Sequence, residues 1–318
     1  MKISLLRPCL AAVATAAILI SSSPAYGYGP MNRLNPSGPG GRIFGLDISR
    51  YQHGTSAPID FAKMARSGVS FLWINGGNSI AKADAQAAKF YLADRVAAQG
   101  QGIYTGLYYF VHLPNTTSAS IIKRNADDQA NKIITRINTQ GGLNYLDLPV
   151  ALDIETTCTR TSLFGICRHH FSPAQTALWV NEWQKVILAA THRNPVIYSF
   201  LSLLHGSLGT NHSLVLDPLW VSTAGISAAK PNSQPAQRKG GCSSNIWTDE
   251  SCTMQWSFWQ YSSGGNGRTY GIPSGQVDLD VFAGSAQDFI NLAQSGTGVP
   301  LGTPVITAVE TNTATAAH

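Results

Sequence analysis

The feature that most constrains the fold is a regular alternation of strand-like and helix-like segments from residue 42 onward. The strand-like runs cover 42–49, 69–75, 103–111 and 148–155, and helical segments at 58–67, 84–99 and 120–139 lie between them. Strands that alternate with helices in this way pair in parallel and are joined by helical crossovers. The alternation therefore predicts an α/β fold with a largely parallel sheet.

The second half of the chain becomes richer in strands. Ser172 is expected to cap a helix that begins at Pro173 and runs to about residue 192. Strands are then expected at 195–200, 219–223, 255–261 and 276–281, followed by a helix at 286–294. Because α/β barrels of this size commonly form one domain, a single domain is predicted over 42–295.

Both ends of the chain differ in composition from this domain. Residues 1–25 combine basic Lys2 and Arg7, an apolar run over 10–20 and small residues at 23–25, which predicts a cleavable signal peptide. The apolar run is about half the roughly 20 residues of a spanning helix, although a retained anchor is the alternative. Gly- and Pro-rich 26–41 is predicted to be a flexible linker, and Thr- and Ala-rich 296–318 a disordered tail. The protein is thus expected to be exported, to the periplasm or outside the cell.

The chain has five cysteines, of which one lies in the predicted signal peptide. The other four form two local pairs, Cys158 with Cys167 and Cys242 with Cys252, and an even number suits an oxidising compartment. Four cysteines allow three connectivities, and the short-range one is favoured because each pair would close one small loop. Their spacing does not fit a zinc site, and we expect neither a metal nor a cofactor.

The charge pattern argues against a nucleic-acid partner. Charged residues make up only 12% of the chain, and basic residues are scattered, with no basic run longer than Arg238 and Lys239. No phosphate-binding loop followed by Lys and Ser or Thr is present.

Acidic residues lie on the inner faces of several predicted strands. Side chains two apart on a strand share a face, so Val150, Leu152 and Ile154 oppose Asp153 and Glu155. Paired acids of this kind serve glycoside hydrolysis, and acids gathered in one pocket raise one another's pKa values. The competing interpretation is a solvated strand end.

Two further strands repeat this pattern. Asp47 is a lone acid in an apolar strand, and Asp278 and Asp280 share the face opposite three aliphatic residues, although an exposed edge strand would look the same. Aromatic side chains that could stack on sugars lie on nearby strands. The alternative is plain core packing, which is expected for about half of them. Trp179 and Trp183, at helical spacing, are expected to belong to the core. The candidate substrate-binding residues are Tyr108, Phe110, Tyr198, Trp259, Gln260 and Asp280.

An ordered set of short motifs resembles glycoside hydrolase family 25, the Chalaropsis-type lysozymes. The motifs are FGLDISRYQ at 44–52, IDF at 59–61, GLYYF at 106–110, PVALDIE at 149–155, PVIYS at 195–199, LWV at 219–221, WQYSS at 259–263 and VDLDVF at 277–282. The resemblance covers roughly 44–290. It implies an irregular TIM-like (β/α) barrel with fewer helices than a regular eightfold barrel.

The resemblance also implies a function and roles for the acids. A family member would be a muramidase that cleaves the β-1,4 bond between N-acetylmuramic acid and N-acetylglucosamine with retention of configuration. Glu155 would be the general acid/base, Asp153 would orient the N-acetyl group or stabilise the oxocarbenium centre, and Asp47 and Asp278 would tune charge and hold the sugar. Catalysis assisted by the substrate's own acetamido group is favoured over direct displacement by a carboxylate. We expect a monomer without a stable membrane anchor that acts on peptidoglycan strands.

Departures from the family pattern leave alternatives open. The run NGGNS at 75–79 replaces a segment that usually carries charged residues, and the insert at 225–254 is not part of the pattern. A catalytically weak wall-binding protein on the same barrel is one alternative. Another is a different glycosidase acting on N-acetylated glycans, although the DxxDxDxE pattern of chitinases is absent because Asp147 lies six residues before Asp153.

Overall fold

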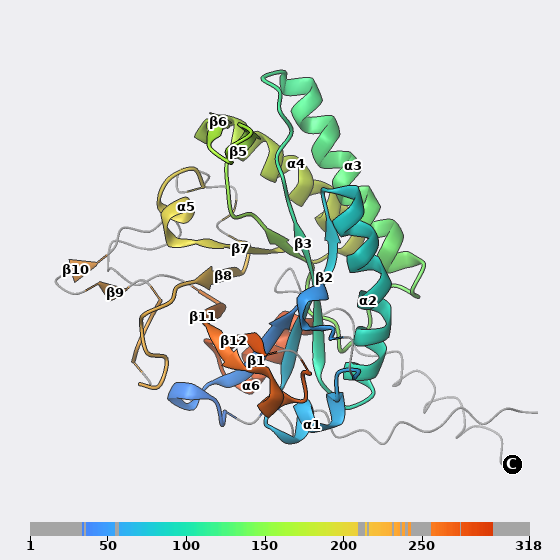
Figure 1. The fold of residues 1–318 in the computed structure, drawn as a ribbon, viewed down its shortest axis with the longest axis vertical. Coiled ribbons are helices and arrows are strands. Elements are labelled where there is room, and N and C mark those ends of the chain that lie inside the picture. The colour runs from blue at the N-terminus through green and yellow to red at the C-terminus, as the bar shows by residue number, and fades with distance from the viewer. Residues whose placement is uncertain are drawn as a thin grey trace, which may run out of the picture.

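Eight strands close into a barrel in a computed structural model of the chain (Figure 1). The structure describes residues 34–294 except 35, 55–56, 209–213, 215, 231, 236, 239–240, 243–255 and 274. Around the barrel the order is β1-β12-β11-β8-β7-β4-β3-β2. The bounds are β1 Ile43–Ile48, β2 Phe71–Asn78, β3 Tyr104–Phe110, β4 Ala151–Asp153, β7 Val196–Phe200, β8 Leu219–Ser222, β11 Phe258–Asn266 and β12 Gln276–Phe282.

The last strand is the exception to parallel pairing. Strand β12 runs antiparallel to both of its neighbours, β1 and β11, while the other six pairings are parallel. A 3₁₀ turn at Gly267–Tyr270, and no α-helix, connects β11 to β12. The described residues contain six α-helices: α1 Phe61–Arg66, α2 Ala81–Gln99, α3 Ala119–Asn138, α4 Pro173–Thr191, α5 Leu201–His205 and α6 Ala286–Gln294. The expected irregular α/β barrel is confirmed.

Local sequence signals account for the start of helix α4. Ser172 accepts a hydrogen bond from the backbone N–H of Gln175, whose side chain bonds back to Ser172, and Pro173 occupies the first turn of α4. Helix α3 packs against α4 through an apolar stripe at helical spacing. Its buried members are Ile122, Ala126, Ala130, Ile133 and Ile137.

Strand alternation produces two apolar layers, one inside the barrel and one between the strands and the helices. Val150, Leu152 and Ile154 belong to the outer layer, together with the buried Trp179 and Trp183, as the sequence predicted. Ala151 belongs to the inner layer. Because Asp153 shares the face of Ala151, the last residue of β4 points into the barrel.

Large aromatic rings fill the barrel interior, and glycines make room for them. A Cβ on Gly45 would lie 2.2 Å from the ring of Phe71, and one on Gly106 would lie 2.1 Å from the ring of Trp73. Trp73 stacks on Trp220 with ring centroids 4.8 Å apart. These rings make a solid floor beneath the end of the barrel where the parallel strands terminate.

Helix α6 closes the opposite end of the barrel. Its Phe289 is fully buried, with ring centroids 5.6 Å from Phe71, 5.1 Å from Tyr104 and 5.1 Å from Phe282. Phe71 and Tyr104 begin parallel strands and Phe282 ends the antiparallel one, so all three mark the same end.

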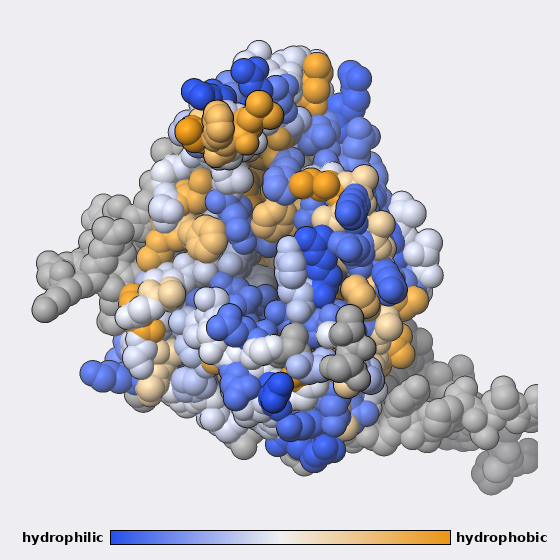
Figure 2. All heavy atoms as spheres, in the orientation of Figure 1, coloured by the Kyte–Doolittle hydropathy of each residue, from blue (hydrophilic) through white to orange (hydrophobic). Residues whose placement is uncertain are grey.

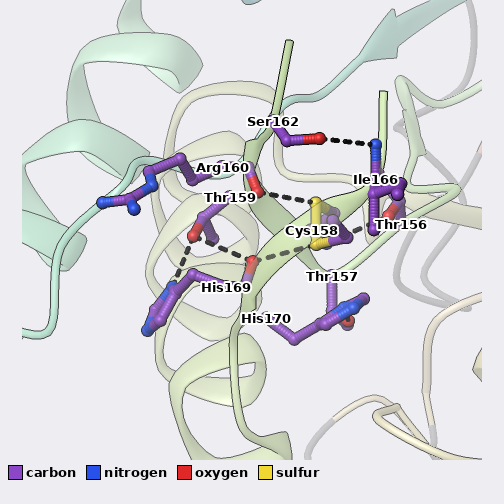
Figure 3. Close-up of a disulfide and its surroundings, with 10 residues drawn as sticks. Thr156, Thr157, Cys158, Thr159, Arg160, Ser162, Ile166, His169 and His170 are labelled. Atoms are coloured by element: carbon purple, nitrogen blue, oxygen red, sulfur yellow. Dashed lines mark hydrogen bonds between the residues drawn. A yellow bond between two sulfur atoms is a disulfide. The ribbon is translucent and has the colours of Figure 1, made fainter. Parts of the chain in front are cut away.

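A small hairpin follows β4 directly and carries a disulfide (Figure 3). Strands β5 Cys158–Thr161 and β6 Cys167–His170 pair antiparallel, and Cys158 is bonded to Cys167 with 5.8 Å between their Cα atoms. This is one of the two predicted local pairs. Cys242 lies in the short strand β10 Gly241–Cys242, which pairs with β9 Gln237–Arg238, but its predicted partner Cys252 lies outside the described residues.

Several predictions on chain organisation fall on residues that the structure does not describe. These are the signal peptide at 1–25, residues 26–33 and 35 of the linker at 26–41, and the tail at 296–318. Within the described ranges, no helix has the length and apolar character needed to cross a membrane.

Candidate active site

A cavity of about 750 Å³ opens at the carboxyl ends of the parallel strands, which is the end where barrel enzymes place their active sites. The space-filling view shows a hollow in this face of the molecule (Figure 2). The predicted site residues that line it are Asp47, Tyr108, Phe110, Asp153, Glu155, Tyr198, Gln260 and Asp278. All eight strands of the barrel contribute side chains to the lining. Because these strands are spread from β1 to β12 along the chain, closure of the barrel is what brings the side chains together.

Asp153 and Glu155 enter the cavity from the end of β4. Asp153 is only 5% exposed, and its Oδ1 atom has no hydrogen-bond partner among the described residues. Burial, and then the charge of Glu155, raises the pKa of Asp153 well above its ordinary value. Burial, and then the charge of Asp278, also raises the pKa of the half-buried Glu155. The pair therefore favours holding a proton at a pH where isolated carboxyls are ionised.

Three further acids form a second cluster across β1 and β12. Asp47 lies opposite Asp278 in the strand register, and Asp280 lies opposite Gly45. Burial raises the pKa of Asp280 well above its ordinary value, and the charge of Asp278 adds to this. Burial, and then the charges of Asp278 and Asp280, raises the pKa of Asp47 well above its ordinary value.

The side chain of Gln260 fixes the orientation of Asp47. Its Oε1 accepts hydrogen bonds from Tyr198 Oη at 2.9 Å and Ser222 Oγ at 2.7 Å. Since the carbonyl oxygen is engaged by two hydroxyls, the amide Nε2 points at Asp47 and donates to its Oδ2 at 2.7 Å. The amide therefore connects three strands, β7, β8 and β11, to the acid on β1.

Two of the predicted substrate-binding residues lie outside the cavity. Trp259 is fully buried in the outer layer, where its Nε1 donates to the carbonyl of Thr223 at 3.2 Å. Neighbours on a strand face opposite sides, so Gln260 can point into the barrel only if Trp259 points out. Asp280 is fully buried behind Asp47 and accepts a hydrogen bond from Trp220 Nε1 at 2.8 Å.

The structure adds cavity residues that sequence reasoning did not select. They include Ser49, Arg50, Tyr51, Asn75, Asn78, His112, Phe200, Trp220 and Ser222. Alternation along β8 could have identified Trp220 and Ser222, which oppose the aliphatic face of Leu219 and Val221. No strand pattern could identify Arg50 and Tyr51, because they lie in the 3₁₀ turn Arg50–Gln52 that follows β1.

Arg50 and Tyr51 form part of the cavity rim. The guanidinium carbon of Arg50 lies 4.6 Å from the centroid of the Tyr51 ring, and Arg50 Nη1 donates to Gln86 Oε1 on α2 at 2.5 Å. The Tyr51 ring is 70% exposed. The pair thus offers a flat aromatic face and a cation beside the acids. Among the described residues, no group of three or more His, Cys, Asp or Glu side chains is arranged to hold a metal ion.

Comparison with known proteins gives consistent matches. The family model for glycosyl hydrolases family 25 matches residues 46–270. Lysozyme M1 of Streptomyces globisporus is 28% identical over 272 residues, which cover 85% of this chain and 77% of the relative. The crystal structure of the bacterial lysozyme from Streptomyces coelicolor aligns with a TM-score of 0.57 and 27% identity, covering 79% of this chain and 97% of that chain. A muramidase from Acremonium alcalophilum, at 24% identity and a TM-score of 0.54 over 79% of this chain and 99% of its own, shares the fold.

Proposed function

Because the chain belongs to glycosyl hydrolases family 25 and is therefore a glycoside hydrolase, we propose that it cleaves the β-1,4 bond between N-acetylmuramic acid and N-acetylglucosamine in peptidoglycan. The observation that carries this proposal is the pair of acids with raised pKa values, Asp153 and Glu155, at the end of β4 in an open cavity. The similarity to lysozyme M1 over most of the chain supports the same substrate.

In this proposal Glu155 is the general acid and then the general base. Its carboxyl is half-buried at the cavity wall, where it can reach a glycosidic oxygen. The protonated carboxyl gives its proton to the leaving oxygen as the bond breaks, and the resulting carboxylate later takes a proton from the attacking water. The raised pKa of Glu155 serves the first of these steps because it keeps the acid protonated to a higher pH than an isolated carboxyl would allow.

Asp153 is proposed to orient the N-acetyl group of the sugar whose bond is broken. Its Oδ1 atom is buried without a partner, so an acetamido N–H could satisfy it. Such a contact would aim the acetamido oxygen at the anomeric carbon and would favour substrate-assisted cleavage with net retention. Anomer-resolved NMR of fresh product tests this step, and an initial product of inverted configuration would contradict it.

The remaining polar residues are proposed to prepare Asp47 and to hold the sugar. Asp47 and Asp278 face the cavity and would bind sugar hydroxyls and modulate the charge beside Glu155. Gln260 donates a hydrogen bond to Asp47, and the charge of Asp280, after burial and the charge of Asp278, helps to raise the pKa of Asp47. Asp280 therefore acts as a positioning residue, because its buried carboxyl does not line the cavity. Tyr108, Phe110, Tyr198 and Trp220 would stack against the apolar faces of the sugars.

The proposal is tested by reducing-end release from purified peptidoglycan. The wild type should release reducing ends, and Glu155→Gln should lose about 10²–10⁴-fold in rate because the general acid is gone. Glu182→Gln, on the outer helix α4, is the matched control and should match the wild type. Mass analysis of the fragments should find N-acetylmuramic acid at the new reducing ends. Equal release by the wild type and Glu155→Gln, or N-acetylglucosamine at those ends, would contradict the proposal.

Export through a cleaved signal peptide is a further part of this proposal. The disulfide between Cys158 and Cys167 supports it, because such bonds persist in oxidising compartments. N-terminal sequencing of the secreted protein should begin at Tyr26, and a mature protein that retains Lys2 would contradict cleavage.

A further inference from the structure

The turn between β5 and β6 carries the most exposed large apolar side chains of the described chain. Leu163 is 102% exposed, Phe164 is 88% exposed and Ile166 is 58% exposed. Single exposed apolar residues are ordinary on a protein surface, but three within four positions form a patch that needs a partner. We call residues Leu163, Phe164 and Ile166 the apolar tip.

The hairpin holds the apolar tip in a defined shape. The backbone N–H of Ser162 donates to the carbonyl of Ile166 at 2.8 Å, and the N–H of Gly165 donates to the carbonyl of Ser162 at 3.0 Å. Below this turn, the disulfide joins the two strands (Figure 3). A surface that is already ordered loses little conformational entropy on binding. The tip is therefore suited to binding while remaining exposed in the free protein.

The charges beside the apolar tip have one sign. Arg160 and Arg168 are both exposed, and neither forms an ion pair with the described residues. Residues 156–172 contain no Asp or Glu. In the space-filling view, hydrophobic and hydrophilic residues lie side by side over this hairpin, at the top of the molecule (Figure 2). A partner of complementary chemistry combines an apolar interior with a negatively charged surface.

We propose that the apolar tip inserts into the surface of an anionic lipid bilayer. The side chains of Leu163, Phe164 and Ile166 would enter the boundary between headgroups and acyl chains. The two arginines would remain at the level of the lipid phosphates. A projecting tip of a few residues matches this partner, since a bilayer accepts it without a preformed pocket. This contact is peripheral and reversible, and it goes beyond the hydrolysis proposed above.

Attachment of this kind would orient the enzyme. The hairpin begins three residues after Glu155, and both it and the cavity lie at the carboxyl ends of the parallel strands. A molecule held by the apolar tip would therefore keep its cavity near the bilayer, where it meets glycan strands that lie close to the membrane.

Vesicle co-sedimentation of the mature chain tests the proposal. Vesicles of phosphatidylglycerol mixed with phosphatidylcholine should bind the wild type, and vesicles of phosphatidylcholine alone should bind it at least about tenfold more weakly, because only the anionic lipid attracts the arginines. The double variant Leu163→Ser with Phe164→Ser should lose about tenfold or more in affinity for the anionic vesicles. Arg160→Gln with Arg168→Gln should also bind more weakly and lose most of its dependence on salt.

Leu216→Ser is the matched control. Leu216 is also strongly exposed, but it precedes β8 at the other end of the barrel, so its variant should bind vesicles as the wild type does. All variants should release reducing ends from soluble peptidoglycan fragments at the wild-type rate, which separates this test from that of the hydrolase. Three outcomes would overturn the proposal: unchanged vesicle binding by the apolar-tip variant, equal binding of the wild type to neutral and anionic vesicles, or no binding by the wild type. The last outcome would point to a protein partner for the apolar tip.

Discussion

Asp147 and Asp153 lie six residues apart and are both buried, yet they differ in the hydrogen bonds and charged partners around their carboxyl groups. Asp147 receives hydrogen bonds on both oxygens. Arg95 Nε donates to Oδ1 at 2.9 Å and Arg95 Nη2 to Oδ2 at 2.5 Å, while Gln99 Nε2 donates to Oδ1 at 2.8 Å. The backbone N–H of Asn144 adds a bond to Oδ2 at 2.7 Å. This carboxylate is fully compensated at the end of the barrel away from the cavity.

Within the part of the chain that the structure describes, Asp153 has neither a cationic partner nor a complete set of hydrogen bonds. One of its oxygens is unpaired, and its charged neighbour, Glu155, is of the same sign. Burial without compensation costs free energy, which proteins usually avoid. The difference teaches that the same residue type, in the same stretch of chain, stabilises the barrel at one end and is held ready for a ligand at the other.

The largest expected effect comes from breaking the compensated site. Asp147→Asn removes the countercharge of the buried Arg95 guanidinium, and we expect the free energy of unfolding to fall by about 3–5 kcal/mol. Urea unfolding followed by circular dichroism measures this. The exposed Asp128→Asn on α3 is the control and should change stability by less than about 0.5 kcal/mol. If Asp147→Asn were as stable as the control, the ion pair would not support the fold.

The corresponding change at the uncompensated site should act on activity instead. Asp153→Asn should lower kcat by about 10²–10³-fold, because it removes the carboxylate that we propose supports the transition state. Its free energy of unfolding should stay the same or rise, since an amide is easier to bury than a charge. Steady-state kinetics and urea unfolding of the same preparation measure both. A loss of stability like that of Asp147→Asn would remove the contrast between the two sites.

Asp217 sharpens the comparison. It lies at the same end of the barrel as Asp147, but no described residue forms an ion pair with it. Gln184 Nε2 donates to its Oδ1 at 2.9 Å, its Oδ2 has no partner, and burial raises the pKa of Asp217 to about 8. A raised pKa means that the folded state binds the proton more tightly. Stability from this group is present below the unfolded pKa, near 4, and is lost as pH rises toward 8.

Asp217→Asn should remove this loss of stability. Between pH 5 and 8 the wild type should lose up to about 1.4 kcal/mol per pH unit more than the variant does. Urea unfolding at several pH values measures the two slopes. Identical slopes would mean that Asp217 titrates in the folded protein as it does in the unfolded one. The lack of an ion-pair partner would then not explain the difference between Asp217 and Asp147.

The smallest expected effect tests how the acids of the cavity influence one another. The charge of Asp278 contributes to the raised pKa of Glu155, second to burial. In Asp278→Asn the pKa of Glu155 should fall. If Glu155 is the general acid, as proposed, it then loses its proton at a lower pH, and the alkaline limb of the kcat profile moves to lower pH. The exposed Asp288→Asn should leave that limb in place. An unchanged limb in both variants would assign it to another group.

Strand alternation predicted much of this arrangement. It placed Asp47, Asp153 and Asp278 on inward faces because apolar residues occupy the alternate positions. Helix α4 was predictable from Ser172 and Pro173, since its cap is built from neighbouring residues. Signals of this kind are local, and a local pattern survives in the folded chain wherever packing agrees with it.

Other features depend on contacts that no local pattern encodes. Alternation treats Asp47 and Asp280 alike, but barrel closure places Asp280 behind Asp47 and away from the cavity. The sequence likewise does not distinguish Asp147 from Asp153, because the difference is made by Arg95 on a distant helix. The sequence predicts Trp259 as a sugar-stacking residue, but its ring points outward because its neighbour Gln260 occupies the inward position. The antiparallel direction of β12 was also outside what periodicity could predict.

That antiparallel strand has a practical consequence. Because β12 runs back down the barrel, the chain arrives at α6 on the end that Phe289 seals, opposite the cavity and the apolar tip. An affinity tag, a fluorescent reporter or an immobilisation linker joined after α6 would start its path on the face away from both. The protein can thus be tethered to a solid support by that end while its two working surfaces stay accessible to glycan and to vesicles.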